Sequence, residues 1–180
     1  MIRAFVVMCI ALARPALGQA ACDGKSSDQI VQILARGIDL NERFKRSVKS
    51  GDEAAYRSLR QQHEQYSEDI AMPCLSKASQ LLAREVDEPL LEKSVAFSIS
   101  HENSADETVS EAMASVFAHQ PAAMATSMSK LSPARARVLL RSIEAGWPAV
   151  RKGLDSSSRQ EKDSQLKALR DSQVKSATVK

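Results

Sequence analysis

The stretch VKSGDEAAY, residues 48–56, decides the fold because it holds a helix stop and a helix start with hardly any chain between them. Gly51 is the residue type that most readily ends a helix in the left-handed conformation, and Ser50 with Glu53 fits the S-x-x-E capping box that begins one. We therefore predict one helix over about 27–49 and a second over about 52–86. A loop this short makes the two helices antiparallel neighbours in a hairpin.

The residues on either side of this turn repeat with helical periodicity. Ser26 with Gln29 fits a second capping box, at the start of the first helix. Apolar side chains then recur every three or four positions, which is typical of a helix packed along one face. On the first helix the stripe consists of Ile30, Ile33, Leu34, Ile38, Asn41, Phe44 and Val48. On the second it consists of Tyr56, Leu59, His63, Tyr66, Ile70, Cys74, Lys77 and Leu81. Pro73 predicts a kink near residues 69–72.

Residues 1–20 have the plan of a cleavable secretory signal. Arg3 supplies the positive charge, Ala4 to Ala13 (AFVVMCIALA) is an apolar run, and small residues at Gly18 and Ala20 precede the predicted cleavage. The run is too short to span a bilayer, and no other stretch approaches the ~20 apolar residues that a membrane helix needs. We predict a periplasmic or secreted protein with no membrane span.

Cys22 and Cys74 are the two cysteines that remain after this cleavage. Their midpoint is residue 48, near the predicted turn, so a hairpin brings them opposite each other, and an even number of cysteines in an exported chain argues for a disulfide. The bond closes a loop of about fifty residues, worth roughly 4 kcal/mol in the chain-entropy model. The alternative is a lipid anchor on Cys22. It is disfavoured because Gln19 stands where lipoprotein signals generally have an aliphatic residue.

Beyond the hairpin the sequence predicts shorter helices, over about 88–101, 105–119, 121–130 and 133–145. Ser104 with Glu107 and Ser132-Pro133 are start signals, and Gly146 before Trp147-Pro148 is a stop signal. The shared core should consist of Val95, Ile99, Val109, Met113, Val116, Phe117, Met124, Met128, Leu131, Val138, Leu139 and Ile143. We expect an all-α protein: an irregular helical bundle built on the long N-terminal antiparallel hairpin.

The chain divides into a signal peptide over 1–20, a single helical domain over 21–153 and a tail over 154–180. The tail is polar and mixed in charge. Leu166 and Leu169 support only a marginal helix, and we expect the last residues to be disordered.

The overall charge balance excludes one class of partner. The chain has 25 lysines and arginines and 22 aspartates and glutamates. The signal holds two arginines and no acids, so its removal leaves a net charge of +1. A nucleic-acid-binding domain carries a strong basic excess, so we expect no nucleic-acid partner.

The three histidines do not form a metal-binding motif. His63 and His101 are each followed by glutamate, as in H-E-x-x-H, but Ser67 and Ala105 occupy the place of the second histidine. His63 lies on an apolar stripe, which favours a packed helix residue. His101 and His119 are near predicted helix C-termini, where partial positive charge is favourable. We expect no metal and no cofactor.

Two other chemistries stay open as alternatives. Met113, Met124 and Met128, with His119 nearby, could bind a soft ion such as Cu(I), although methionine is also a common filler of irregular helical cores. Two carboxylates could meet across a cleft as in a glycosidase, but nothing in the sequence marks a pair. The sequence has no G-x-S-x-G, C-x-x-C or glycine-rich phosphate loop.

Charge is unevenly distributed along the chain. Residues 84–120 hold eight acids and two bases, whereas residues 121–180 hold twelve bases and five acids. The two segments attract each other within the molecule, form solvated faces, or present a docking surface on which complementary charge selects a protein partner. For a docking surface the candidate residues are Arg135, Arg137, Arg141 and Trp147. Trp147 alternatively covers the core, because residues just past a helix-ending glycine pack back on the preceding turns.

A small, exported, disulfide-bonded helical chain without a catalytic motif is typical of a binding protein. We expect a protein-binding module without catalytic activity, such as an inhibitor, an immunity-type protein or an envelope assembly accessory protein. Its partner should be another exported or envelope protein. The alternatives are an envelope hydrolase that uses an unmarked carboxylate pair and a helical bundle that carries a soft metal.

Overall fold

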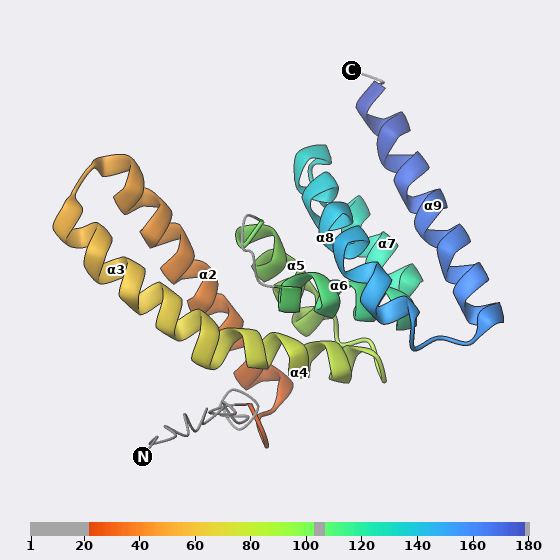
Figure 1. The fold of residues 1–180 in the computed structure, drawn as a ribbon, viewed down its shortest axis with the longest axis horizontal. Coiled ribbons are helices and arrows are strands. Elements are labelled where there is room, and N and C mark those ends of the chain that lie inside the picture. Colours follow the sequence, from red (N-terminus) through yellow and green to blue (C-terminus); the bar gives the residue numbers. More distant parts are fainter. Residues whose placement is uncertain (1–21, 103–106, 179–180) are drawn as a thin grey trace, which may run out of the picture.

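The computed structural model describes residues 22–102 and 107–178, and every regular element within them is a helix (Figure 1). The prediction of an all-α, irregular helical bundle is confirmed. The predicted signal peptide over 1–20 and the predicted cap at Ser104 lie outside the described residues.

Two neighbouring helices, α2 (Ser27–Ser50) and α3 (Glu53–Tyr66), form an arm that projects from the rest of the molecule (Figure 1). The predicted capping box begins α2: the Gln29 N–H donates to Ser26 Oγ at 3.4 Å, and the Ser26 N–H donates to Gln29 Oε1 at 3.0 Å. Gly51 ends α2 with a φ of 71°, the left-handed conformation that glycine adopts without steric cost.

The cap of α3 differs from the prediction. Asp52, not Ser50, is the N-cap, and its Oδ1 accepts from the Ala55 N–H at 3.0 Å. Ser50 still belongs to the last turn of α2, where its hydroxyl donates to the Ser47 carbonyl at 3.0 Å. The cap therefore lies two residues later than the capping-box pattern indicated, because aspartate caps a helix as well as serine does.

The predicted second helix over 52–86 is not one continuous α-helix. A π-helical segment, η1 (Ser67–Ala71), separates α3 from α4 (Met72–Leu82). Pro73 lies in the first turn of α4 and has no N–H to donate. The wider π-helical turn directly precedes α4. The helical run also ends at Leu82, earlier than predicted.

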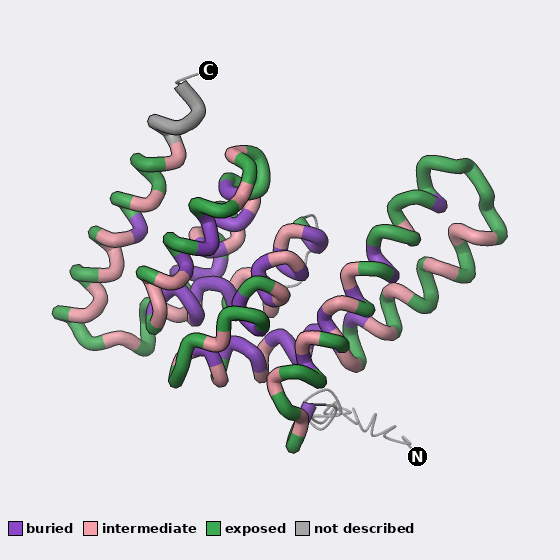
Figure 2. Tube along the Cα trace, turned by 180° about the vertical axis from the view of Figure 1, so that it is seen from behind, coloured by how far each residue is buried: buried purple, intermediate pink, exposed green. Residues whose placement is uncertain are grey.

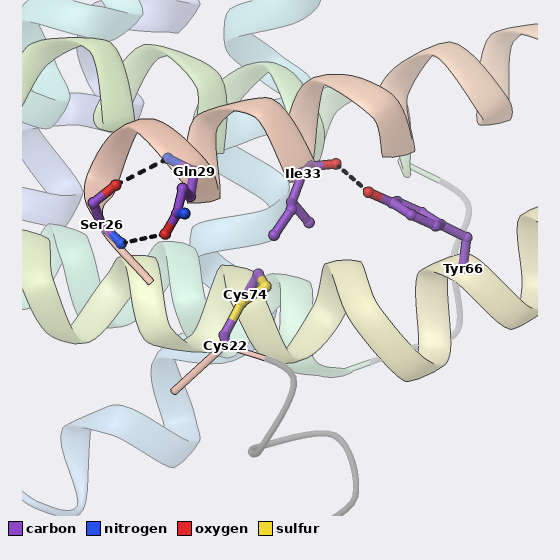
Figure 3. The surroundings of a disulfide bond; sticks show 6 residues. All are labelled: Cys22, Ser26, Gln29, Ile33, Tyr66 and Cys74. Atoms are coloured by element: carbon purple, nitrogen blue, oxygen red, sulfur yellow. Dashed lines mark hydrogen bonds between the residues drawn. A yellow bond between two sulfur atoms is a disulfide. The ribbon is translucent and has the colours of Figure 1, made fainter. Parts of the chain in front are cut away.

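Cys22 and Cys74 form a disulfide, with 5.2 Å between their Cα atoms (Figure 3). Both residues are buried, and they are 52 positions apart in the sequence. The bond ties the short segment before α2 to α4, so it closes the base of the arm.

The body of the molecule consists of α4 together with α5 (Glu88–Ser100), α6 (Glu107–His119), α7 (Pro121–Ser129) and α8 (Pro133–Arg151). α6 packs against α8 and α4, and buried residues concentrate in this region (Figure 2). Most of the predicted core is buried, namely Val95, Val109, Met113, Val116, Phe117, Met124, Met128, Leu139 and Ile143. Ile99, Leu131 and Val138 are only half-buried.

α8 continues through the predicted stop at Gly146-Trp147-Pro148, which corrects that prediction. Gly146 lies against α6 so closely that an added Cβ would be 2.1 Å from the Ser110 carbonyl oxygen. The glycine therefore serves a close helix–helix approach, and packing at Gly146 and Trp147 outweighs the backbone hydrogen bond that Pro148 cannot donate.

The predicted tail is helical over most of its length, as α9 (Ser156–Thr178). Asp155 precedes it, and its Oδ1 accepts from the Ser157 and Ser158 N–H groups at 3.0 and 2.9 Å. These serines also donate their hydroxyls, and together the bonds hold the pKa of Asp155 well below its usual range. Leu166 is buried against the body, which supplies the packing that the composition alone did not reveal.

Candidate interface along α5 and α8

α5 and α8 border a groove on the surface of the body. Both helices pack against α6, and they contact each other directly. Three depressions, of about 120, 200 and 270 Å³, follow α5 from before its first turn to just past its last. The smallest lies between α5 and α7, and the other two reach α8; we call the three together the α5–α8 groove. The smallest depression begins at Val86, whose apolar side chain is exposed.

The middle depression combines an apolar floor with a charged rim. Val95, Ala96 and Leu131 supply apolar surface, and Ala96 and Leu131 are half-buried. At the rim, Lys130 Nζ lies 3.2 Å from Glu92 Oε1, and this ion pair links the end of α7 to α5. An apolar centre surrounded by polar groups is the usual anatomy of a protein interface.

The largest depression lies between the end of α5 and the middle of α8, with α6 at its side. Ser98 donates its hydroxyl to Ser142 Oγ at 3.2 Å, which joins the two helices across the depression. Glu102 and Arg141 form an ion pair at its rim. Val138 lies half-buried on the α8 side, so this depression also combines apolar and polar groups.

The acidic and basic segments of the sequence meet within the molecule. The Glu92–Lys130 and Glu102–Arg141 pairs both join residues 84–120 to residues 121–180. All four side chains are well exposed, so each pair contributes at most about 1 kcal/mol. A partner could therefore replace these ion pairs at little cost.

The four residues predicted as an interface do not lie together. Arg135 and Arg141 line the groove, in its middle and largest depressions respectively. Arg137 is exposed on α8 but does not line a depression of the groove. Across the described residues, neither Arg135 nor Arg137 forms an ion pair with a carboxylate.

Trp147 lies away from the groove and is only 7% exposed. Its ring packs edge-on against Phe117, with 5.7 Å between the ring centroids, and its Nε1–H donates to Asp163 Oδ1 at 2.8 Å. Trp147 therefore packs on α6 and binds α9, which corresponds to the core-cover alternative.

Two of the three histidines join the arm to the body in a stack of rings. Phe44 of α2 stacks on His63 of α3, His63 on His101, and His101 on Phe97 of α5, with ring-centroid distances of 5.4, 5.6 and 4.0 Å. Burial lowers the pKa of His63; the charge of Glu64 opposes this shift, and the charge of Lys45 adds to it. His63 is thus a packed helix residue, as its place on the apolar stripe predicted.

The residues considered for soft-metal binding have other surroundings. Met113, Met124 and Met128 are fully buried in the core. His119 is exposed, and its Nδ1 lies 2.8 Å from the Ser115 carbonyl oxygen. In the part of the chain that the structure describes, no group of three or more His, Cys, Asp or Glu side chains could hold a metal ion.

Comparisons with known proteins add no family to this description. No protein-family model, curated protein or solved structure matches the chain. A search of the described helices for one with the length and apolar character to cross a membrane found none. The functional hypothesis therefore rests on the α5–α8 groove and on the sequence.

Sequence reasoning missed the α5 side of the groove. Ser98 and Glu102 gave no signal, because a serine on a helix and a glutamate beside a histidine each have many ordinary roles. Val138 was assigned to the core by its spacing, and its half-burial in the groove could not be predicted from that spacing.

Proposed function

We propose that this chain is an exported protein-binding module without catalytic activity, and that its partner docks on the α5–α8 groove. The observation that carries the proposal is the groove itself: an apolar floor with an arginine-bearing rim on the packed body. The partner is another exported or envelope protein, as expected from the predicted signal peptide. An inhibitor, an immunity-type protein and an assembly accessory protein all fit this description.

The charges at the rim support a partner with acidic groups opposite α8. Arg135 is exposed, lines the groove and forms no ion pair with a described carboxylate. A carboxylate of the partner could reach its guanidinium without breaking a bond within this chain. Complementary charge of this kind raises the association rate and selects among partners.

The proposal can be tested by site-specific photo-crosslinking in the cells that make the protein. A photoreactive residue replaces Ala96, which is half-buried on the floor of the groove. A matched probe replaces Ala168, which is exposed on α9. We expect a discrete crosslinked protein from position 96 and not from position 168, and mass spectrometry would identify it.

A charge reversal then tests whether the groove determines binding. Arg135→Glu should reduce the crosslinking yield at position 96 by about tenfold or more, because it places like charges across the interface. Lys167→Glu, an exposed substitution on α9, should leave the yield unchanged. The same product from positions 96 and 168, or a yield that Arg135→Glu does not alter, would contradict the proposal.

A further inference from the structure

A second concave surface lies at the turn between α8 and α9, at the opposite end of α8 from Arg135. Its volume is about 570 Å³, and we call it the elbow pocket. Three cationic side chains, Arg151, Lys152 and Arg159, line it together with Trp147 and Pro148. None of these residues lines the α5–α8 groove, so the elbow pocket is a separate site.

One of the three cations is already neutralised within the molecule. Asp163 accepts from Arg151 Nη2 at 2.6 Å and from Arg151 Nε at 3.1 Å, and it also accepts from the Trp147 indole. Hydrogen bonds from Arg151 and Trp147, together with the charges of Arg151 and Arg159, hold the pKa of Asp163 below its usual range. Asp163 therefore stays ionised at neutral pH and holds Trp147 and Arg151, which line one side of the pocket.

Neither of the other two cations lies within ion-pair distance of a carboxylate among the described residues, although the charge of Arg159 also acts on Asp163. Arg159 Nη2 donates to the Leu154 carbonyl at 2.9 Å, which orients the guanidinium without neutralising it, and its Nε has no described acceptor. Lys152 is exposed and forms no ion pair in the described chain. Three cationic side chains around the single carboxylate of Asp163 therefore leave the pocket with an excess of positive charge.

We propose that the elbow pocket binds a dianionic tetrahedral oxyanion, of the phosphate-monoester or sulfate class. The excess of positive charge in the pocket favours an anion of high charge. An arginine held in place and an exposed lysine suit such groups, because the guanidinium gives directed donors and the ammonium a point charge. The apolar edge formed by Pro148 and Trp147 would face whatever group carries the anion.

Trp147 is the only tryptophan of the chain, so its fluorescence reports directly on this pocket. The test titrates the full mature protein with inorganic phosphate and, separately, with sulfate, each against sodium chloride at matched ionic strength. We expect a saturable change in emission with the oxyanions and not with chloride. Equal responses to both oxyanions assign the site to the whole class, and a response to phosphate alone narrows it to phosphate.

Two variants locate the site. Lys152→Gln and Arg159→Gln should each weaken binding by about tenfold or more, since each removes one charge-assisted contact. Lys167→Gln removes one positive charge from an exposed position elsewhere on α9 and should bind like the wild type. Lys152 is exposed and forms no ion pair in the described chain, so its variant should fold normally, which a thermal melt would check.

Three results would overturn the proposal. The first is the absence of a saturable fluorescence change with either oxyanion. The second is an equal change with chloride, which would show a general ionic-strength effect. The third is unaltered affinity in a folded Lys152→Gln protein together with unaltered affinity in Arg159→Gln.

Discussion

The arm and the body of this protein are both helical, but their side chains are buried to different degrees. In the body, α6 and α8 pack through buried side chains, and Gly146 lets their backbones approach closely. In the arm, α3 has no buried residue at all (Figure 2). Amphipathic periodicity is present in both regions, so periodicity shows which face of a helix packs and not how completely it is buried.

Within the arm, α2 packs along α5, and Asn41 and Lys45 donate to the Ser100 carbonyl, whereas α3 is tied to the rest of the molecule by fewer contacts. The Tyr66 hydroxyl donates to the Ile33 carbonyl at 3.2 Å, and the Cys22–Cys74 disulfide lies nearby (Figure 3). Farther out, the ring stack at His63 connects α2 and α3 to α5. We infer that buried side chains stabilise the body throughout. The outer part of the arm is stabilised mainly by contacts between α2 and α3.

The largest effect should follow from filling the close contact in the body. In Gly146→Leu the new side chain cannot fit, because even a Cβ would be 2.1 Å from the Ser110 carbonyl oxygen and the obstacle is backbone. We expect a loss of stability of about 3 kcal/mol or more, or failure to fold cooperatively, measured by thermal and urea unfolding.

Gly153→Ala is the matched control for this substitution. A Cβ there would meet only the Val150 carbonyl oxygen, at an ordinary 3.5 Å. Its stability should stay within about 1 kcal/mol of the wild type. Similar unfolding curves for Gly146→Leu and Gly153→Ala would show that the helices α6 and α8 are not in the close contact described.

The next largest effect should come from opening the base of the arm. Replacing Cys22 and Cys74 with serine removes a crosslink across 52 positions, which the chain-entropy model values at about 4 kcal/mol. For a chain of this size the melting midpoint should fall by roughly 10 °C. The wild-type protein isolated directly from cells should show no thiol that can be alkylated without reduction. Two reactive thiols in that protein would refute the pairing.

The smallest effect should be a pH dependence of the ring stack. Burial lowers the pKa of His63 from the ordinary value of 6.5, so the unfolded chain takes up a proton more readily than the folded one. Stability contributed by the neutral imidazole is therefore complete above pH 6.5 and falls as the pH drops below it. His63→Phe keeps a ring in the stack and should reduce the loss of melting temperature between pH 7 and about pH 5.5.

His119→Phe provides the control for this pH effect, because His119 is exposed and outside the stack. It should retain the acid sensitivity of the wild type. If His63→Phe and the wild type lose stability in parallel over this range, protonation of His63 is not the cause of the acid-induced loss.

Local signals in the sequence predicted much of the fold. The Ser26–Gln29 box, the left-handed Gly51 and the Ser132 cap all lie where the sequence placed them, because caps depend on neighbouring residues only. The disulfide could also be predicted, since a hairpin turn fixes which residues face each other. The predicted export supplied the chemical reason to expect a bond there.

Features that depend on distant contacts could not be predicted in this way. Gly146 and Pro148 resemble a helix end, and only the proximity of α6 explains why α8 continues. Leu166 is one apolar residue in a polar segment, and its burial depends on where α9 meets the body. The α5–α8 groove requires that two helices distant in sequence lie side by side, which no local pattern reveals.

The contrast between arm and body can be measured most directly by native-state hydrogen exchange of the oxidised protein. Amides that exchange only on global unfolding should lie in α6 and α8, where burial is continuous. Amides of α3 should exchange at least about a hundredfold faster, by local opening that leaves the body folded. Protection of α3 equal to that of α6 and α8 would contradict the account, because it would show that the arm and the body unfold as one unit.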